Sequence, residues 1–157
     1  MTKHTLISWT AVILWMSIIF YLSHQPGSQS SELSLNFAEP LIEAVEKVSP
    51  EASVYIEDFH TYVRKSAHFI AYLIMGILSV NALKASGVQG FRKISMAFAI
   101  CLLFAASDEF HQLFIDGRSG EARDVLIDSA GALVGIGIYS LSRKWLPRSK
   151  RKPYHFA

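Results

Sequence analysis

Ionisable side chains are concentrated in the stretch DEFHQLFIDGRSGEARDVLID, residues 108–128, which separates two apolar runs. Asp108, His111 and Gln112 are spaced at i, i+3 and i+4, so a helix would place them on one face, whereas Glu109 would point elsewhere. A histidine beside a carboxylate can act as a nucleophile or transfer protons, because the carboxylate orients the imidazole ring. The stretch is therefore a candidate for acid–base or nucleophilic chemistry.

A second group of polar residues lies in the sequence HTYVRKSAHFIAY. His60, Arg64, His68 and Tyr72 recur every four residues and would form one stripe of a helix, with Lys65 beside His68. Arginine and lysine side chains bind phosphate groups, and arginine does so through paired hydrogen bonds. This stripe adds a candidate anion site to a second candidate histidine.

A third group follows the first along the chain. Asp124 and Asp128 are four residues apart and share a helix face, and Arg118 lies in the turn that precedes them. Asp128 would lie about one helical turn deeper in its apolar segment than Asp124. A charge at the centre of a bilayer costs roughly 2.5–3.5 kcal/mol on insertion scales, so charges that persist in such segments are candidates for function.

The elements that must position these residues are four apolar runs. Of the 157 residues, 51% are hydrophobic, and each run approaches the ~20 residues that a membrane-spanning helix needs. The runs cover about residues 6–22, 66–83, 94–114 and 125–145. No small-residue cleavage site follows the first run, so it is expected to be a retained helix and not a signal peptide. The sequence predicts one all-α domain over residues 1–157, a four-helix bundle integral to the membrane.

The distribution of charge predicts how the bundle is oriented. With a cytoplasmic N-terminus, the inner segments are residues 1–5, 84–93 and 143–157, and they hold ten of the fifteen Lys and Arg residues and none of the thirteen Asp and Glu residues. Short loops rich in Lys and Arg stay on the cytoplasmic side. Both termini of this multi-pass cell-membrane protein are therefore predicted to be cytoplasmic, with residues 143–157 as a basic tail.

Three further features bear on the fold. Apolar residues recur at helical spacing from Leu33 to Val48, which predicts an amphipathic helix on the outer side, between the first two spans. Gly131 and Gly135 form a G-x-x-x-G pair, which predicts close packing of the fourth span. Cys101, the single cysteine, is interpreted as a small packing residue.

This topology would bring the three polar groups together at the outer end of the bundle. Two interpretations follow. The charges pair between helices or reach toward the lipid headgroups, and then they only hold the bundle together. Alternatively they form a functional site, which we prefer because so many ionisable groups converge within apolar segments.

The sequences RKSAHFIAYLIMG and DEFHQLFIDGRSGEARDVLIDSAGALVG, with the exit SHQPGSQSS after the first run, resemble the VanZ-like family of small bacterial membrane proteins. The resemblance is carried by Lys65, His68, Asp108, Glu109, His111, Gln112, Gly117, Arg118 and Asp124. Asp128 stands where the family usually has Asn, which adds a negative charge. The resemblance implies an all-helical protein of the bacterial envelope and, through the family's name, a link to resistance to the glycopeptide teicoplanin. It implies no particular reaction.

Three functions fit these residues. The first is a hydrolase or transferase that acts on a phosphorylated lipid or cell-wall precursor, with His68 or His111 as nucleophile or general acid–base, oriented by Asp108 or Asp124. Its candidate substrate-binding residues are Arg64, Lys65, Glu109, Gln112 and Arg118. The second is a non-catalytic binder of an anionic lipid or precursor, and the third is a purely structural polar network.

The bilayer is the expected partner, and no nucleic-acid partner is expected. A metal variant of the enzyme would use His68, Asp108, His111 and Asp124 as ligands. However, the spacing Asp-x-x-His is less specific than the zinc motif His-Glu-x-x-His, so no metal is assigned. The cofactor and the oligomeric state stay open.

Overall fold

The computed structural model describes residues 2–30, 32–33, 36 and 56–145, and no strand occurs in this part of the chain. The helices are α1 (Lys3–Ser23), α3 (Ile56–Ala85), α4 (Gly90–Gln112) and α5 (Ala122–Trp145). The predicted all-α fold is confirmed. The amphipathic helix predicted from Leu33 to Val48 lies almost entirely outside the described residues and stays a prediction.

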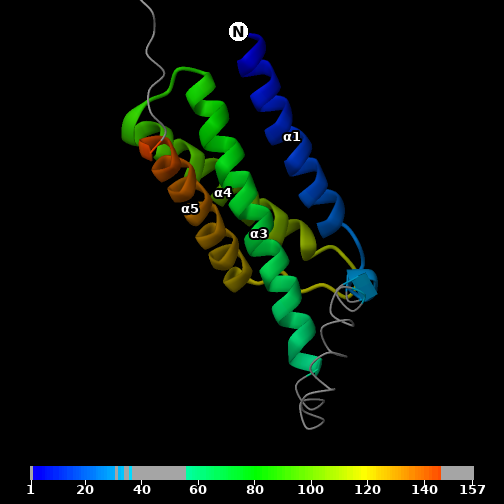
Figure 1. Ribbon diagram of the computed structural model, residues 1–157. Coiled ribbons are helices and arrows are strands. Elements are labelled where there is room, and N and C mark those ends of the chain that lie inside the picture. The colour runs from blue at the N-terminus through cyan, green and yellow to red at the C-terminus, as the bar shows by residue number, and fades with distance from the viewer. Residues whose placement is uncertain (1, 31, 34–35, 37–55, 146–157) are drawn as a thin grey trace, which may run out of the picture.

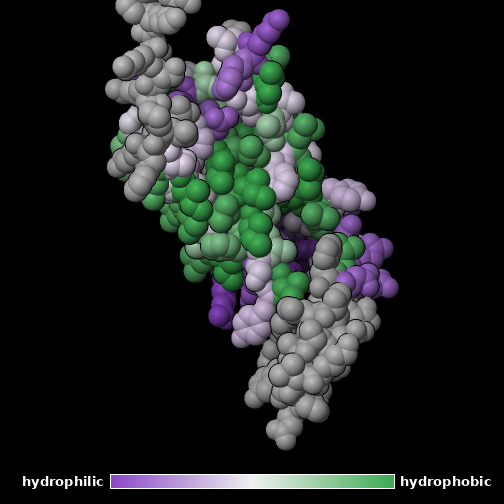
Figure 2. All heavy atoms as spheres, viewed as in Figure 1, coloured by the Kyte–Doolittle hydropathy of each residue, from purple (hydrophilic) through white to green (hydrophobic). Residues whose placement is uncertain are grey.

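All four helices are long and apolar enough to cross a membrane, with spans at Lys3–Ser23, Thr61–Ala85, Gly90–Gln112 and Ala122–Ser142. The third span ends earlier than predicted, because Phe114 N bonds to the His111 carbonyl at 3.0 Å and the chain turns there. Figure 2 shows a hydrophobic band over the middle of the molecule, with hydrophilic residues toward its two ends. Such a band matches the hydrocarbon layer of a bilayer, so this is a multi-pass membrane protein.

The helices alternate in direction along the bundle. Figure 1 shows the start of α1, the α3–α4 connection and the end of α5 together at the top. The end of α1, the start of α3 and the α4–α5 turn lie toward the opposite side, which we call the α4–α5 end. This is the arrangement that the sequence predicted for the polar groups, because all three groups belong to segments at this end.

The closest packing in the bundle is between α3 and α5. A Cβ atom at Gly131 or Gly135 of α5 would collide with the backbone carbonyl of Phe69 or Leu73 of α3. Gly76 of α3 makes a similar approach to the backbone of α5. Glycine lets the two backbones come together, as small residues do at membrane helix interfaces, and the packing predicted for the glycine pair is confirmed.

Helix α1 is held to α3 by hydrogen bonds near its start and near its middle. Trp15 Nε1 donates to the Ala71 carbonyl at 2.8 Å, and Thr5 Oγ1 donates to the Ala85 carbonyl at 2.8 Å. Many other large side chains of α1, among them Ile7 and Ile13, are exposed. Exposed apolar surface of this extent is typical of a lipid-facing helix. Cys101 is buried in the core, consistent with a packing role.

The α4–α5 turn packs on the chain that leaves α1. Gly27 N donates to the Asp116 carbonyl at 3.0 Å, and a Cβ atom on Gly27 would collide with the carbonyl of Gly117. Gly117 has φ = 72°, a left-handed conformation that favours glycine. The turn is therefore fixed against α1, and this fixes the position of Arg118, the next residue.

Candidate functional site

Four carboxylates are buried at the α4–α5 end: Asp108, Glu109, Asp124 and Asp128. They come from α4 and α5, and each has different neighbours. Helical phase places Asp108 and Glu109 on different faces of α4, yet both are buried, because the end of α4 is enclosed on more than one side.

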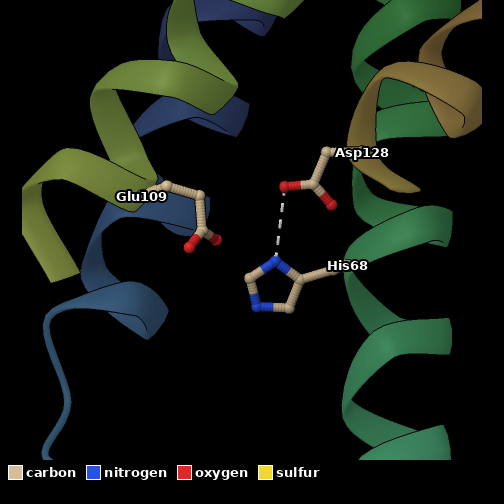
Figure 3. A group of neighbouring side chains, drawn as sticks. All are labelled: His68, Glu109 and Asp128. Carbon is tan, nitrogen blue, oxygen red and sulfur yellow. Dashed lines mark ion pairs between the residues drawn. The ribbon is translucent and has the colours of Figure 1, made fainter. Parts of the chain in front are cut away.

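His68 of α3 lies between two of these carboxylates, as Figure 3 shows. Its Nδ1 atom is 3.5 Å from Asp128 Oδ2. Glu109 also points toward the ring, from α4 (Figure 3). The sequence suggested Asp108 or Asp124 as the acid that orients a histidine, but the acid paired with His68 is Asp128.

Asp108 and His111 do not form the pair that their spacing suggested. Asp108 Oδ2 accepts a hydrogen bond from Ser23 Oγ of α1 at 2.7 Å. The His111 ring instead stacks on Phe20, with centroids 4.6 Å apart, and its Nε2 lies 3.1 Å from His24 Nδ1. Both contacts cross to α1. The spacing of residues within α4 could not reveal the position of that helix.

Gln112 and Arg118 link the end of α4 to α1. Gln112 Nε2 lies 3.5 Å from Asp108 Oδ2 and 3.4 Å from Glu109 Oε1. Arg118 donates from NH1 to Gln112 Oε1 at 3.3 Å. It also donates from Nε to the Gln25 carbonyl at 2.9 Å and from NH2 to the Leu22 carbonyl at 3.1 Å. The guanidinium thus caps α1, and these hydrogen bonds use three of its five N–H groups.

The charge of Arg118 is set by opposing effects. Burial lowers the pKa of the guanidinium, and the nearby charge of Arg64 lowers it further, whereas Asp108 and Glu109 raise it. Arginine nevertheless stays protonated in proteins. Arg118 therefore places a partly buried positive charge beside the buried acids.

Lys65 and Arg64 of α3 pair with acids at the start of α5 and just before it. Lys65 Nζ is 3.5 Å from Asp124 Oδ1 and 3.9 Å from Glu121 Oε2. Arg64 NH2 is 4.0 Å from Asp124 Oδ2. Asp124 is thus balanced by two cations, which is the structural pairing that the sequence allowed. Because Asp124 is buried, the two cations offset part of the cost of burying its charge.

A cleft of about 460 Å³ opens between α1 and α3. Most of its wall is apolar and comes from Trp15, Ile18, Ile19, Leu22, Val63, Ala67, Ile70, Ala71 and Ile74. Its polar lining includes Ser23, Gln25, Arg64, His68, Tyr72 and Arg118. Ile18 and Ile70 are exposed, so the cleft opens on the lipid-facing surface.

The cleft gathers only part of the predicted site. Arg64, His68 and Arg118 line it, whereas Lys65 and Asp124 do not. The remaining candidates, which are Asp108, Glu109, His111 and Gln112, also lie outside its lining. Lys65, Asp108 and Asp124 are instead engaged in contacts between helices.

Sequence reasoning did not assign roles to Asp128 or Ser23. Asp128 shares a helix face with Asp124 and lies one turn deeper, and this depth was the signal that could have singled it out. Ser23 is a common residue at the end of an apolar run, and nothing in its local sequence indicates a bond to Asp108. Neither contact can be derived from spacing along one helix.

One group of side chains has the composition of a metal site. Ligand atoms of His68, Glu109 and Asp128 all lie within 4.8 Å of one another. This set differs from the one considered from the sequence, since His111 and Asp124 are bound elsewhere and Asp108 is bonded to Ser23.

Comparison with known proteins gives one match. A family model described as VanZ/LLP1 matches residues 8–143, which is most of the chain. Neither the curated proteins nor the solved structures contain a match. The match covers α3 and α4 entirely, most of α1 and α5, and every residue of the site described above. On this basis the chain belongs to the VanZ/LLP1 family.

Proposed function

We propose that this protein binds a phosphorylated lipid or lipid-linked cell-wall precursor in the α1–α3 cleft and catalyses hydrolysis or transfer of its phosphoryl group. The observation that carries the proposal is that the cleft has an apolar part and a polar part. Its long walls are apolar, and Arg64, His68 and Arg118 contribute to its polar lining. A lipid phosphate has the same division, with an apolar chain and an anionic head.

The position of the cleft suits a ligand that arrives from the membrane. Ile18 and Ile70 line it and are exposed on the lipid-facing surface. A chain could therefore enter sideways between α1 and α3 and exchange contacts with bulk lipid for contacts with the cleft. Arg64 and Arg118 would then neutralise the phosphate, with the planar guanidinium suited to paired hydrogen bonds.

His68 is the residue that would act on the phosphoryl group. Asp128 faces Nδ1 of His68, which would orient the ring and leave Nε2 for a nucleophilic or proton-transfer step. Because His68 lines the cleft, it would meet the head of a bound lipid. The positive charges of Arg64 and Arg118 would stabilise the charge on the reacting phosphoryl group.

The second candidate is a binder without catalysis. Arg118 donates hydrogen bonds to Gln112 and to two backbone carbonyls, an arrangement that suits a fixed phosphate cradle as well as a reaction site. With cytoplasmic termini the cleft would face the outer leaflet. Holding a wall precursor there would connect this member with the glycopeptide resistance for which its family is named.

The two candidates can be separated with purified protein in lipid nanodiscs. The probe is a long-chain isoprenyl diphosphate, and the dephosphorylated isoprenol of equal length is the control ligand. We expect the diphosphate to bind and to release phosphate, and we expect the isoprenol to bind much more weakly. His68→Asn should keep binding and lose phosphate release, because it removes the reacting nitrogen but no cation.

Arg64→Gln should weaken binding of the diphosphate. The matched control is Arg123→Gln, which removes the same charge from an exposed position at the same end, outside the cleft lining. Binding without any phosphate release by the wild type would favour the binder. Equal affinity for the diphosphate and the isoprenol would refute both candidates, because both functions require that the protein recognises the phosphate group.

A further inference from the structure

Three helices bring one histidine and two carboxylates to a single point inside the bundle. His68 comes from α3, Glu109 from α4 and Asp128 from α5, and the three side chains point toward one another (Figure 3). Their ligand atoms lie within 4.8 Å of one another. Among the described residues, Lys65 forms its ion pairs with Glu121 and Asp124 and with neither of these two acids.

Asp128 is the member of this group whose charge is least compensated. Its side chain is 0% exposed, and neither carboxylate oxygen has a hydrogen-bond partner among the described residues. His68 Nδ1 is equally without a hydrogen bond, although it lies 3.5 Å from Asp128 Oδ2. A buried carboxylate normally accepts several hydrogen bonds or coordinates a metal, so this one has room for a further partner.

The neighbouring lysine and arginine side chains do not supply that partner. In the described part of the chain, no Lys or Arg forms an ion pair with Asp128 or Glu109. Glu109 is instead held by neutral donors, with Glu121 N donating to Oε2 at 2.9 Å and Gln112 Nε2 lying 3.4 Å from Oε1. Such neutral contacts orient a carboxylate without cancelling its charge, as outer partners of metal ligands do.

We propose that His68, Glu109 and Asp128 bind one divalent transition-metal ion of the Zn²⁺ or Mn²⁺ type. One imidazole nitrogen with two carboxylate oxygens is a donor set suited to these ions. Bonds of about 2.0–2.1 Å in a tetrahedral site place neighbouring ligand atoms roughly 3.3–3.4 Å apart. The 3.5 Å between His68 Nδ1 and Asp128 Oδ2 is close to that spacing, but it is long for a charge-assisted hydrogen bond.

The ion would take the place of a proton between Nδ1 and Asp128. Three protein ligands leave a coordination position open, as in catalytic metal sites, and Nε2 of His68 stays available to a ligand. The inference does not depend on the lipid proposal, because it rests on the three ligands alone and is tested without any lipid substrate.

The test measures metal binding to the full-length protein. The protein is purified with an affinity tag that contains no histidine, treated with a chelator and equilibrated with Zn²⁺ or Mn²⁺, with Mg²⁺ in a parallel sample. We expect one tightly bound Zn²⁺ or Mn²⁺ per chain by elemental analysis, and no comparable retention of Mg²⁺. Absence of stoichiometric Zn²⁺ and Mn²⁺ in the wild type would overturn the proposal.

Variants locate the ion. Asp128→Asn and Glu109→Gln should each weaken metal affinity by more than about 100-fold, because loss of an outer-shell partner alone costs roughly 10–100-fold. Asp116→Asn removes the same charge from an exposed side chain in the α4–α5 turn and should leave affinity unchanged. His24→Asn should also have no effect. If it abolishes binding while Asp128→Asn does not, the ion belongs to the His24–His111 pair and the proposal is wrong.

A spectroscopic measurement on the wild type covers the case in which a variant fails to fold. X-ray absorption of the Zn²⁺-loaded protein should show nitrogen and oxygen ligands with the scattering of a single imidazole. Scattering from two imidazoles, or from sulfur, would contradict the assigned ligands.

Discussion

At the scale of single residues, the buried acids of the α4–α5 end differ in what balances them. Asp124 faces two cations and Asp108 accepts a hydroxyl hydrogen bond, whereas among the described residues the ion-pair partner of Asp128 is the ring of His68. Burial of a carboxylate without adequate partners costs several kcal/mol. The acids with protein partners are therefore part of the framework, and Asp128 with His68 is where we propose that a ligand binds.

The bond between Ser23 and Asp108 predicts a measurable contribution to stability. Ser23→Ala removes the 2.7 Å donor from a buried carboxylate, so unfolding free energy should fall by about 1–3 kcal/mol. The matched control is Ser17→Ala, because Ser17 Oγ bonds only its own helix at an exposed position. Thermal melting of both variants in detergent should show a clear loss for Ser23→Ala alone. Equal melting temperatures would contradict this role for Asp108.

Arg118→Lys should be damaging although it keeps the positive charge. A lysine ammonium cannot reproduce the fork that reaches Gln112 and the Leu22 and Gln25 carbonyls together. We expect a lower melting temperature and weaker binding of the isoprenyl diphosphate. Arg123→Lys, at an exposed position of α5, is the control. Full stability with normal binding in Arg118→Lys would show that charge alone is needed there.

At the scale of the elements, backbone contact between α3 and α5 holds the site in register. Gly131, Gly135 and Gly76 permit that contact, and His68 and Asp128 are carried by the two helices that it joins. Separation of α3 from α5 would therefore lengthen the distance between His68 and Asp128 directly.

Two glycines of α5 provide a matched test of this packing. Gly135→Ala places a Cβ against the Leu73 carbonyl, whereas the Cβ of Gly137→Ala meets nothing within 4 Å. Overpacking of this kind typically costs about 1–3 kcal/mol, so Gly135→Ala should lower the melting temperature and Gly137→Ala should not. Similar behaviour of the two variants would show that α3 and α5 are not tightly apposed at Leu73.

The elements were the part of the structure that the sequence predicted best. Apolar runs of sufficient length specify the helices, and the Gly131 and Gly135 spacing specifies where α5 packs. Helical phase placed Glu109 on a different face from Asp108, but it could not reveal how many neighbours enclose one helix, and both side chains are buried. Contacts between distant helices were also hidden: His111 shares a face with Asp108, but the ring is held by Phe20 and His24 across the interface with α1.

At the scale of the whole molecule, the charge distribution predicts which end of the bundle faces the cytoplasm. Because the number of spans is even, the start of α1 and the end of α5 lie at one end of the bundle (Figure 1). Both termini are then on the same side of the membrane. The predicted cytoplasmic tail is basic, whereas the acids of the α4–α5 end would face outward. The α1–α3 cleft would then open to the outer leaflet.

Cysteine labelling tests this orientation in intact cells. In a Cys101→Ser background, Ser119→Cys in the exposed α4–α5 turn should react with a membrane-impermeant maleimide. Ser149→Cys in the basic tail should react only after permeabilisation. The reverse pattern would place the site on the cytoplasmic side and remove the link to the outer leaflet.

The most direct test of the central claim is an experimental structure of the protein in nanodiscs with a long-chain isoprenyl diphosphate. We predict density for the apolar chain between α1 and α3, along Trp15 and Ala71, with the diphosphate within hydrogen-bond reach of Arg64 and Arg118 and next to His68. Density for the lipid on another face of the bundle, with the α1–α3 cleft closed or filled by protein, would contradict the account.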